Sequence, residues 1–246
     1  MIRAMWLAGA LITVAQGAAA VECASVIFQE ARYSICEVDA TVEDLELFLY
    51  DDAGDPLGQF ATVDGALAEQ NKRLIFAMNA GMYHENRAPV GHYVEDGKEI
   101  MRVIDTAGPG NFGLLPNGVF CLREGRADVF ETTRYIKDDP RCEDATQSGP
   151  MLVIDGALHP RFLADGTSKY IRNGVGTSAD GTRAYFAISD EPVNFHSFGL
   201  LFRDHIKVPN ALYFDGNISR LYAPSLKRSD FGFSLGPIVG VVAPIE

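Results

Sequence analysis

The chain has 246 residues, of which 47% are hydrophobic and 22% charged, and its formal net charge at pH 7 is −12. No repeat, linker or low-complexity segment divides it, so the composition favours an ordered globular protein. The acidic balance argues against binding of nucleic acid or of anionic lipid through bulk electrostatics. It leaves room for a local basic pocket that holds a phosphate.

The first 20 residues resemble a secretory signal peptide: Arg3 precedes an apolar run over residues 4–14, and the small residues Gly17–Ala20 follow. This order favours cleavage after Ala20. An uncleaved membrane anchor is the alternative, although the apolar run is short for a bilayer span. Cleavage changes the net charge from −12 to −13, because Arg3 is the only charged residue of the segment. We therefore expect residues 21–246 to form one domain of a periplasmic or secreted protein, without membrane insertion after cleavage.

The four cysteines have no CxxC spacing and few nearby histidines, which argues against a structural zinc site. In an exported protein two disulfides are expected, and four cysteines allow three pairings. Pairing between sequence neighbours predicts Cys23 with Cys36 and Cys121 with Cys142. The alternative is that one or both pairs remain buried thiols.

In chain order, short runs rich in β-branched and aromatic residues predict strands at 25–36, 45–50, 74–78, 91–94, 118–122, 127–130, 151–154, 184–188 and 211–214. Turn residues at Asp52–Asp55 and Glu95–Lys98 predict hairpins. Helices are expected over Val63–Gln70 and, from the helical spacing of apolar residues, over Phe195–His205. The predicted fold class is a β-rich α+β domain with a mixed sheet and a few helices.

Polar residues and glycines gather in four segments, each next to a predicted strand. Taken singly, each segment is explained as a turn, because Asn, Gly and Ser favour turn geometry. Taken together, they favour a polar pocket built from several loops. The candidate residues are Asn79, Gly81, Glu85 and His92 in the first segment, Gln147, Ser148 and Gly149 in the second, Arg172 and Asn173 in the third, and Asp215, Gly216, Asn217 and Ser219 in the fourth; Glu191 is a further carboxylate.

This inventory suits a sugar joined to phosphate, because hydroxyls pair with amides and carboxylates, and phosphate pairs with arginine and backbone N–H groups. A serine hydrolase fits less well, since Gln147–Pro150 places a proline where the helix of a nucleophile elbow would begin. Neither a P-loop nor a Rossmann glycine pattern is present. No cofactor is expected. A divalent cation held by Asp215, Glu191 and Asn217 stays an open alternative, although no spacing demands it.

Read in order, the four segments resemble the phosphodiester glycosidase family over residues 74–223. The strings that carry the resemblance are Asn79-Ala80-Gly81-Met82-Tyr83, Gly149-Pro150 through Asp155-Gly156, Arg172-Asn173-Gly174-Val175-Gly176, and Phe214-Asp215-Gly216-Asn217-Ile218-Ser219. The resemblance implies hydrolysis of a bond between an anomeric carbon and phosphate, in a glycan or glycolipid that contains sugar phosphate. It also implies a catalytic or sugar-orienting role for Asp215 and a phosphate-clamping role for Arg172. Glu191 and Glu85 would be candidates for a second carboxylate.

The chain departs from the family pattern at several positions. Ala80 stands for a glycine, Asn173 for a threonine, and Asn217 and Ile218 with Arg220 for two glycines and a serine. A bulky Ile218 is expected to narrow the pocket, so the departures predict a different substrate. Two alternatives to an enzyme stay open: a glycan-binding protein without turnover, and an envelope assembly factor with the same pocket.

Overall fold

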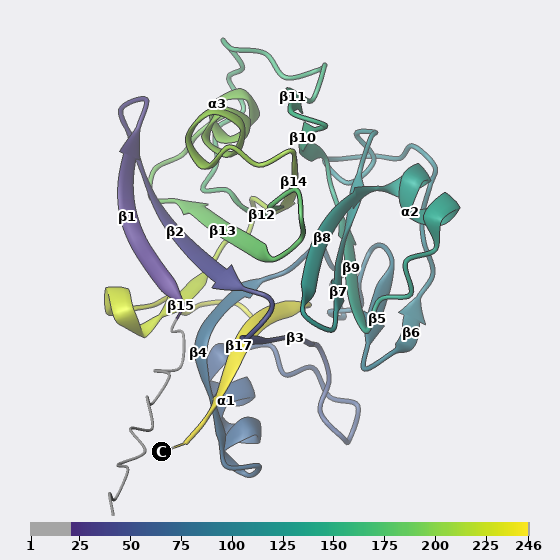
Figure 1. Ribbon diagram of the computed structural model, residues 1–246, viewed down its shortest axis with the longest axis vertical. Helices are drawn as coiled ribbons and strands as arrows, with labels where there is room; N and C mark the ends of the chain where they lie inside the picture. The colour runs from purple at the N-terminus through teal and green to yellow at the C-terminus, as the bar shows by residue number, and fades with distance from the viewer. Residues whose placement is uncertain (1–20, 246) are drawn as a thin grey trace, which may run out of the picture.

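The computed structural model describes residues 21–245, which fold into three antiparallel sheets with a few short helices (Figure 1). The first sheet has the strand order β1 (Glu22–Phe28), β2 (Ala31–Asp39), β13 (Arg183–Ser189), β12 (Asn173–Thr177), β14 (Asn210–Asp215), β10 (Met151–Ile154) and β11 (Ala157–Leu158). The second has the order β16 (Arg228–Ser229), β15 (Leu221–Ala223), β4 (Lys72–Asn79), β17 (Ile238–Pro244) and β3 (Asp44–Phe48). The third has the order β6 (Lys98–Met101), β5 (Tyr93–Glu95), β9 (Asp144–Ser148), β7 (Gly118–Arg123) and β8 (Arg126–Glu131).

The β-rich α+β prediction is confirmed, but the strand directions differ from the mixed sheet that was expected. Every pairing between the named strands of residues 21–245 is antiparallel. Parallel neighbours need long crossover connections, usually helices. The short turns of this chain instead favour hairpins.

One hydrophobic core joins the three sheets. At its centre, Phe186 of the first sheet lies 4.9 Å from Phe76 of the second and 5.7 Å from Phe120 of the third, between ring centroids. Phe214, on β14, packs edge-on against Phe120 at 6.2 Å. All four rings are fully buried. Because aromatic side chains bury large areas, this cluster fixes how the sheets meet, and with it the positions of the strand ends.

The nine predicted strands are all present in the structure, with one correction. The run 25–36 is two strands rather than one, because the chain reverses between β1 and β2 at Gln29 and Glu30, which have φ of 47° and 67°. Neither residue is typical of such a turn, so the sequence did not indicate it. The hairpin predicted at Glu95–Lys98 is confirmed as the β5–β6 turn.

Two segments expected to be polar loops are buried strands. β9 contains Gln147 and Ser148, β12 begins at Asn173, and every residue of both strands is buried. Their polar side chains are accepted in the interior because they find hydrogen-bond partners there. In β12, a Cβ on Gly174 would lie 2.4 Å from the carbonyl oxygen of Leu212, so glycine permits the close approach of β14.

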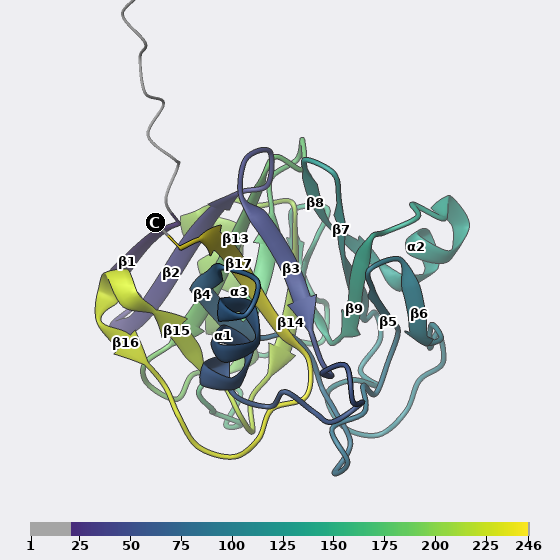
Figure 2. The same cartoon turned by 90° about the horizontal axis from the view of Figure 1, so that it is seen from below.

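The helices lie at the margins of the sheets. α1 (Phe60–Ala68) packs along β4 (Figure 2), and α3 (Phe195–Leu200) continues into a π-helical turn over Leu201–Ile206. These elements confirm the two predicted helices, with α1 starting three residues before the predicted residue 63. α2 (Thr132–Asp138) was not predicted, and a 3-10 turn covers Pro224–Leu226.

Two disulfides have the predicted pairing. Cys23–Cys36 joins β1 to β2, and Cys121–Cys142 joins β7 to the segment before β9. The predicted signal peptide lies outside the residues that the structure describes. Between residues 21 and 245, no helix combines the length and the apolar character needed to cross a bilayer.

Candidate functional site

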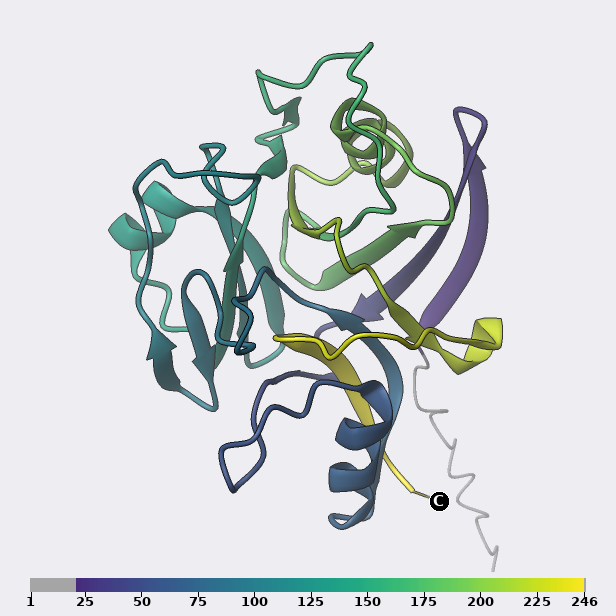
Figure 3. The ribbon, with the colours of Figure 1, turned by 180° about the vertical axis from the view of Figure 1, so that it is seen from behind.

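Three of the predicted polar segments meet where the first and second sheets adjoin. β4 ends at Asn79, β12 begins at Asn173, and β14 ends at Asp215, with Asn173 and Asp215 opposite one another in the β12–β14 ladder. From Asp215 the chain crosses to the second sheet through residues 216–220 and enters β15, which pairs with β4 (Figure 3). The topology therefore brings residues far apart in the sequence to one junction.

Two buried amides hold this junction together. Asn173 Nδ2 donates to the backbone oxygen of Asn79 at 2.9 Å and to its side-chain Oδ1 at 3.1 Å. Asn79 Oδ1 also accepts from the backbone N–H of Arg220 at 2.9 Å, and Asn173 Oδ1 accepts from that of Asp215 at 3.2 Å. Both amides are fully buried. They bind the backbone around Asp215, and this positions the carboxylate.

Asp215 is the carboxylate that the junction holds. Its Oδ1 accepts from the backbone N–H groups of Gly216 at 2.6 Å and Asn217 at 2.9 Å. Burial raises the pKa of Asp215, and the hydrogen bonds from Asn217, Gly216 and Ile218 offset this only in part. The pKa of Tyr83 is raised by burial and then by the negative charge of Asp215. A carboxyl whose pKa is raised by burial is a candidate for proton transfer.

The segment after Asp215 is closely packed. Ser219 Oγ lies 3.0 Å from the carbonyl oxygens of Ile171 and Asp215 and 3.2 Å from Asn173 Oδ1, and its single proton serves one of them at a time. A Cβ on Gly216 would lie 2.0 Å from Tyr213 Oη, so a side chain there requires a shift. Ile218 packs against the apolar cluster that α1 covers.

Arg172 precedes Asn173 but lies fully buried in a cage of aromatic rings. Its guanidinium carbon lies 3.6 Å from the Phe195 ring centroid, 5.3 Å from that of Tyr213 and 5.5 Å from that of Tyr170. Nε donates to the carbonyl of Val193 at 2.9 Å and Nη2 to that of Ser168 at 3.0 Å. Nη1 and Tyr213 Oη have no hydrogen-bond partner among residues 21–245. Burial lowers the pKa of Arg172.

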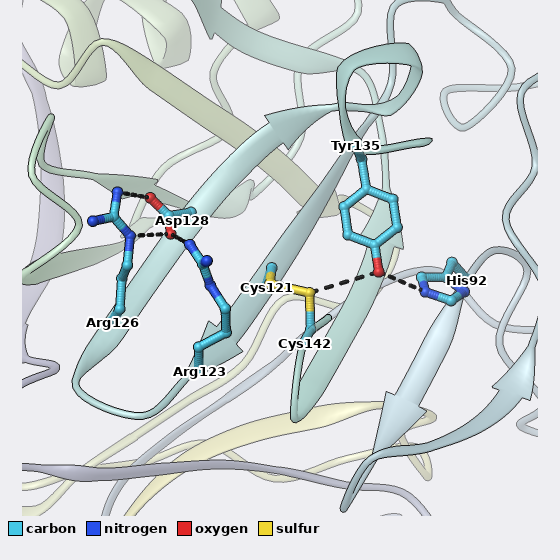
Figure 4. Close-up of a disulfide and its surroundings, with 7 residues drawn as sticks. All are labelled: His92, Cys121, Arg123, Arg126, Asp128, Tyr135 and Cys142. Carbon is cyan, nitrogen blue, oxygen red and sulfur yellow. Dashed lines mark hydrogen bonds and ion pairs between the residues drawn. A yellow bond between two sulfur atoms is a disulfide. The ribbon is translucent and has the colours of Figure 1, made fainter. Parts of the chain in front are cut away.

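The predicted residues of the second segment form a separate polar group in the third sheet. Gln147 Oε1 accepts from the N–H groups of His92 and Ile104, each at 3.0 Å, and Nε2 donates to the Ile104 carbonyl at 2.7 Å. Figure 4 shows His92 beside the Cys121–Cys142 disulfide, with Nε2 3.0 Å from Tyr135 Oη. Burial lowers the pKa of His92. Ser148 Oγ donates to the carbonyl of Phe214 at 2.8 Å, which links this sheet to the strand that carries Asp215.

The remaining predicted residues lie around these two groups. Gly81 lies beside Thr146, whose hydroxyl donates to the Ala80 carbonyl at 2.8 Å, and Gly149 packs against Asn117. Glu85 is exposed. Glu191 is also exposed, and its Oε2 accepts from the backbone N–H of Arg32 at 2.7 Å. The structure thus brings together Asn79, Asn173, Asp215, Gly216, Asn217 and Ser219, with Arg172 behind them, and places Gln147, Ser148, His92, Glu85 and Glu191 elsewhere.

A cleft of about 740 Å³ adjoins the junction. Residues 169–171, 216–220 and 229–233 line it, together with Pro192. Its lining contains two cationic side chains, Lys169 and Arg220, and one carboxylate, Asp230, which forms an ion pair with Arg228 at 2.9 Å. Because Arg220 is only 5% exposed, Lys169 is the one exposed cation of this lining.

Residues 72–231 match the family described as phosphodiester glycosidase. The chain belongs to the phosphodiester glycosidase family. The matched part begins with β4 and includes all the strand ends of the junction.

One curated relative and two solved structures are similar to this chain. The uncharacterized protein YigE of Escherichia coli is 36% identical over 170 residues, which are 66% of this chain and 64% of YigE, just under two thirds of that relative. The catalytic domain of zebrafish N-acetylglucosamine-1-phosphodiester α-N-acetylglucosaminidase, auto-inhibited by its pro-peptide, has a TM-score of 0.59 and 12% identity, over 90% of this chain and 81% of that one. A hypothetical protein from Synechocystis has a TM-score of 0.58 and 10% identity, over 90% of this chain and 61% of that one. At these identities the two structures show a shared fold.

Several residues near the junction and the cleft were not predicted as site residues. Tyr83 belongs to the first motif but was not assigned a role, although it lies near enough to Asp215 to respond to its charge. Lys169 stands in a segment without periodicity, so no pattern pointed to it. Arg220 was noted only as a departure from the family string. Across residues 21–245, no group of three or more His, Cys, Asp or Glu side chains is arranged to hold a metal ion.

Proposed function

We propose that this protein is an exported hydrolase that cleaves the bond between a sugar and phosphate in a glycosyl phosphodiester. The observation that carries the proposal is the position of Asp215, which the buried amides of Asn79 and Asn173 hold directly before Gly216 and Asn217, two residues that line the cleft. Membership of the phosphodiester glycosidase family supports the reaction class. Export is supported by the two disulfides, because such bonds persist in oxidising compartments.

In the proposed reaction Asp215 acts at the anomeric carbon. The bond between that carbon and the phosphate oxygen breaks, and the departing oxygen keeps the electron pair. Water bonds to the anomeric carbon, and its proton passes to the Asp215 carboxylate. Phosphate is a good leaving group, so stabilisation of the positive sugar and of the departing charge supplies most of the acceleration.

The phosphate needs a cation, and we assign that role to Lys169. Its side chain lines the cleft, whereas Arg172 is fully buried under Tyr170 and makes two hydrogen bonds to backbone carbonyls. Direct contact between Arg172 and phosphate therefore requires Tyr170 and Ser168 to move. In the proposal Arg172 holds the segment that carries Lys169.

Asp215→Asn tests the proposal. The amide keeps the acceptor for the turn and removes the base, so kcat for the methyl phosphodiester of N-acetylglucosamine is expected to fall by about 10²–10⁴-fold, with released reducing sugar as the readout. In heavy-oxygen water the label is expected in the sugar and not in the phosphate. Asp165→Asn, a substitution of an exposed aspartate, is the matched control. Label in the phosphate, or undiminished turnover by Asp215→Asn, would refute the assignment.

One observation favours a second function, glycan binding without turnover. Asp230 is the one carboxylate in the cleft lining and is paired with Arg228, whereas Asp215, Glu85 and Glu191 all lie outside that lining in this conformation. If wild type and Asp215→Asn are equally inactive toward a panel of glycosyl phosphodiesters while wild type binds the intact compounds, the binding function is correct and the hydrolase is wrong.

A further inference from the structure

Two phenylalanines at the cleft are almost completely exposed. Phe231 is 93% exposed and Phe233 is 80% exposed, and both line the cleft beside the junction. Leaving large apolar side chains in water gives no stability, and exposed apolar groups at a concave surface are typical of binding sites. The family match ends at residue 231, so this pair lies at the limit of what the family describes.

The loop that carries the two rings is held by the polar side chains of Arg220 and Gln59. Arg220, 5% exposed, donates through Nη2 to the carbonyl of Phe233 and through Nη1 to Gln59 Oε1 at 3.1 Å. Gln59 Nε2 in turn donates to the carbonyl of Gly232 at 3.0 Å. A loop with anchored carbonyls presents its side chains at little entropic cost, which favours binding by a preorganised surface.

The ends of the loop are fixed as well. Asp230 Oδ2 accepts from the backbone N–H of Leu221 at 3.0 Å, and the Ser234 carbonyl accepts from Tyr83 Oη at 3.2 Å. Arg220 also ties the loop to the candidate site, because its backbone N–H donates to Asn79 Oδ1. Figure 3 shows the connection from β16 to β17, which contains the loop, on the same side of the molecule as the connection from β14 to β15.

The rest of the lining indicates what the rings contact. Tyr170, 47% exposed, adds a third aromatic side chain, while Ser219 and Asn217 add a hydroxyl and an amide. Aromatic faces interspersed with groups that both donate and accept hydrogen bonds suit a sugar ring, which has apolar C–H faces and a rim of hydroxyls. An acyl chain would leave these polar groups without partners.

We propose that Phe231 and Phe233 form a carbohydrate-binding platform on which a sugar ring of the substrate stacks. The proposal rests on the proposed function in one respect: the platform serves the same cleft and holds a sugar unit of the glycosyl phosphodiester beside Asp215. It makes the substrate class an oligosaccharide or glycan, rather than a single sugar phosphate with a small apolar group.

The test measures binding of phosphate-free probes to the full-length chain by calorimetry, with a panel of neutral tetrasaccharides that includes the N-acetylglucosamine tetramer. Wild type is expected to bind at least one of them. The double variant Phe231→Ala with Phe233→Ala is expected to lose affinity at least about tenfold, because both rings lose their contact area with the sugar. Ile27→Ala, which truncates an apolar residue 71% exposed on β1, is the matched control and should bind like wild type.

A tryptophan variant gives a second, independent readout. Trp6 is the only tryptophan of the chain, so Phe233→Trp adds one fluorophore at the cleft. Affinity should be retained, and the added emission should change on sugar binding. Equal affinity of wild type and the double alanine variant overturns the proposal, as does failure of every tetrasaccharide to bind wild type.

Two further outcomes separate this proposal from its rivals. If octyl glycosides bind more tightly than methyl glycosides whatever the sugar, the rings serve an alkyl chain and the carbohydrate platform is wrong. If the platform binds tetrasaccharides but no glycosyl phosphodiester is hydrolysed, the platform stands and the proposed hydrolase fails.

Discussion

Glu95→Gln is expected to stabilise the protein more at pH 8 than at pH 5. Glu95 lies in the third sheet, where its Oε2 accepts from Tyr93 Oη at 2.6 Å. Its pKa is raised from 4.5 to about 7, chiefly by burial; the hydrogen bond from Tyr93 lowers it, and the negative charges of Asp144, Asp96 and Glu46 contribute to the rise. Asp144 is itself 5% exposed, with a pKa raised to about 6 chiefly by burial. Glu95→Gln therefore replaces a carboxylate, whose charged form is destabilised by burial and by neighbouring negative charges, with a neutral amide.

The sign follows from the direction of the shift. Below pH 4.5 Glu95 is protonated in both the folded and unfolded states, so its full stabilising contribution is present. As pH rises through 7 the folded state loses its proton and that contribution disappears. The shift corresponds to a ceiling of about 3 kcal/mol, at about 1.4 kcal/mol per pKa unit. Because Glu95 is only partly buried, solvent screening reduces the expected gain at pH 8 to about 1–2 kcal/mol.

Urea unfolding followed by circular dichroism at the two pH values measures this difference. Subtracting the two proteins at each pH cancels the opposite effect of His92, whose pKa burial lowers. Glu69→Gln, which removes an exposed carboxylate at the end of α1, is the matched control. A difference between wild type and Glu95→Gln that is the same at pH 5 and pH 8 would show that the carboxylate is not destabilised by its surroundings.

Three further predictions concern the junction and the disulfide. Asn173→Ala removes the hydrogen bonds of the Asn173 side chain with Asn79 and with the backbone of Asp215, and should lower the free energy of unfolding by about 2–4 kcal/mol. A loss under about 0.5 kcal/mol in urea unfolding would contradict its bridging role. Cys121→Ser with Cys142→Ser opens a loop with a sequence separation of 21 and should cost about 3 kcal/mol in the same assay. Gly216→Ala should lower the free energy of unfolding by about 1–3 kcal/mol, because the added Cβ would clash with Tyr213 Oη. Adding Tyr213→Phe removes that oxygen and should restore the lost stability. If the losses of the two single variants simply add in the double variant, the clash is refuted.

The sequence predicted the strand ends of the site but not the partners of its amides. Apolar runs that stop at Asn79 and Asp215 place both residues at strand ends, because such runs are long enough for one buried strand each. Asn79 and Asn173, however, are 94 residues apart, and nothing in either segment indicates that the two amides bind each other. Gln147 was misread in the same way: its partners include Ile104, 43 residues away. Local pattern indicates donors and acceptors, whereas tertiary contacts decide which of them face a ligand.

The sequence also did not predict which large side chains are exposed. Phe231 and Phe233 are phenylalanines, a residue type that is usually buried. They are exposed because Arg220 and Gln59 bind the backbone of their loop rather than their rings. Arg172 shows the opposite case. Arginine is almost never fully buried unless it is paired, but Arg172 is fully buried because aromatic rings enclose its guanidinium.

The junction also explains one departure from the family pattern. An asparagine at position 173 donates twice to Asn79 and accepts from Asp215 and Ser219, whereas a threonine hydroxyl has a single proton to donate. The change to asparagine therefore strengthens the link between the sheets and fixes the backbone of Asp215, and it adds no group that faces the cleft. Asn217 and Ile218 do line the cleft. A difference in substrate between this chain and other family members is therefore expected to depend on positions 217 and 218, together with the aromatic loop, and not on position 173.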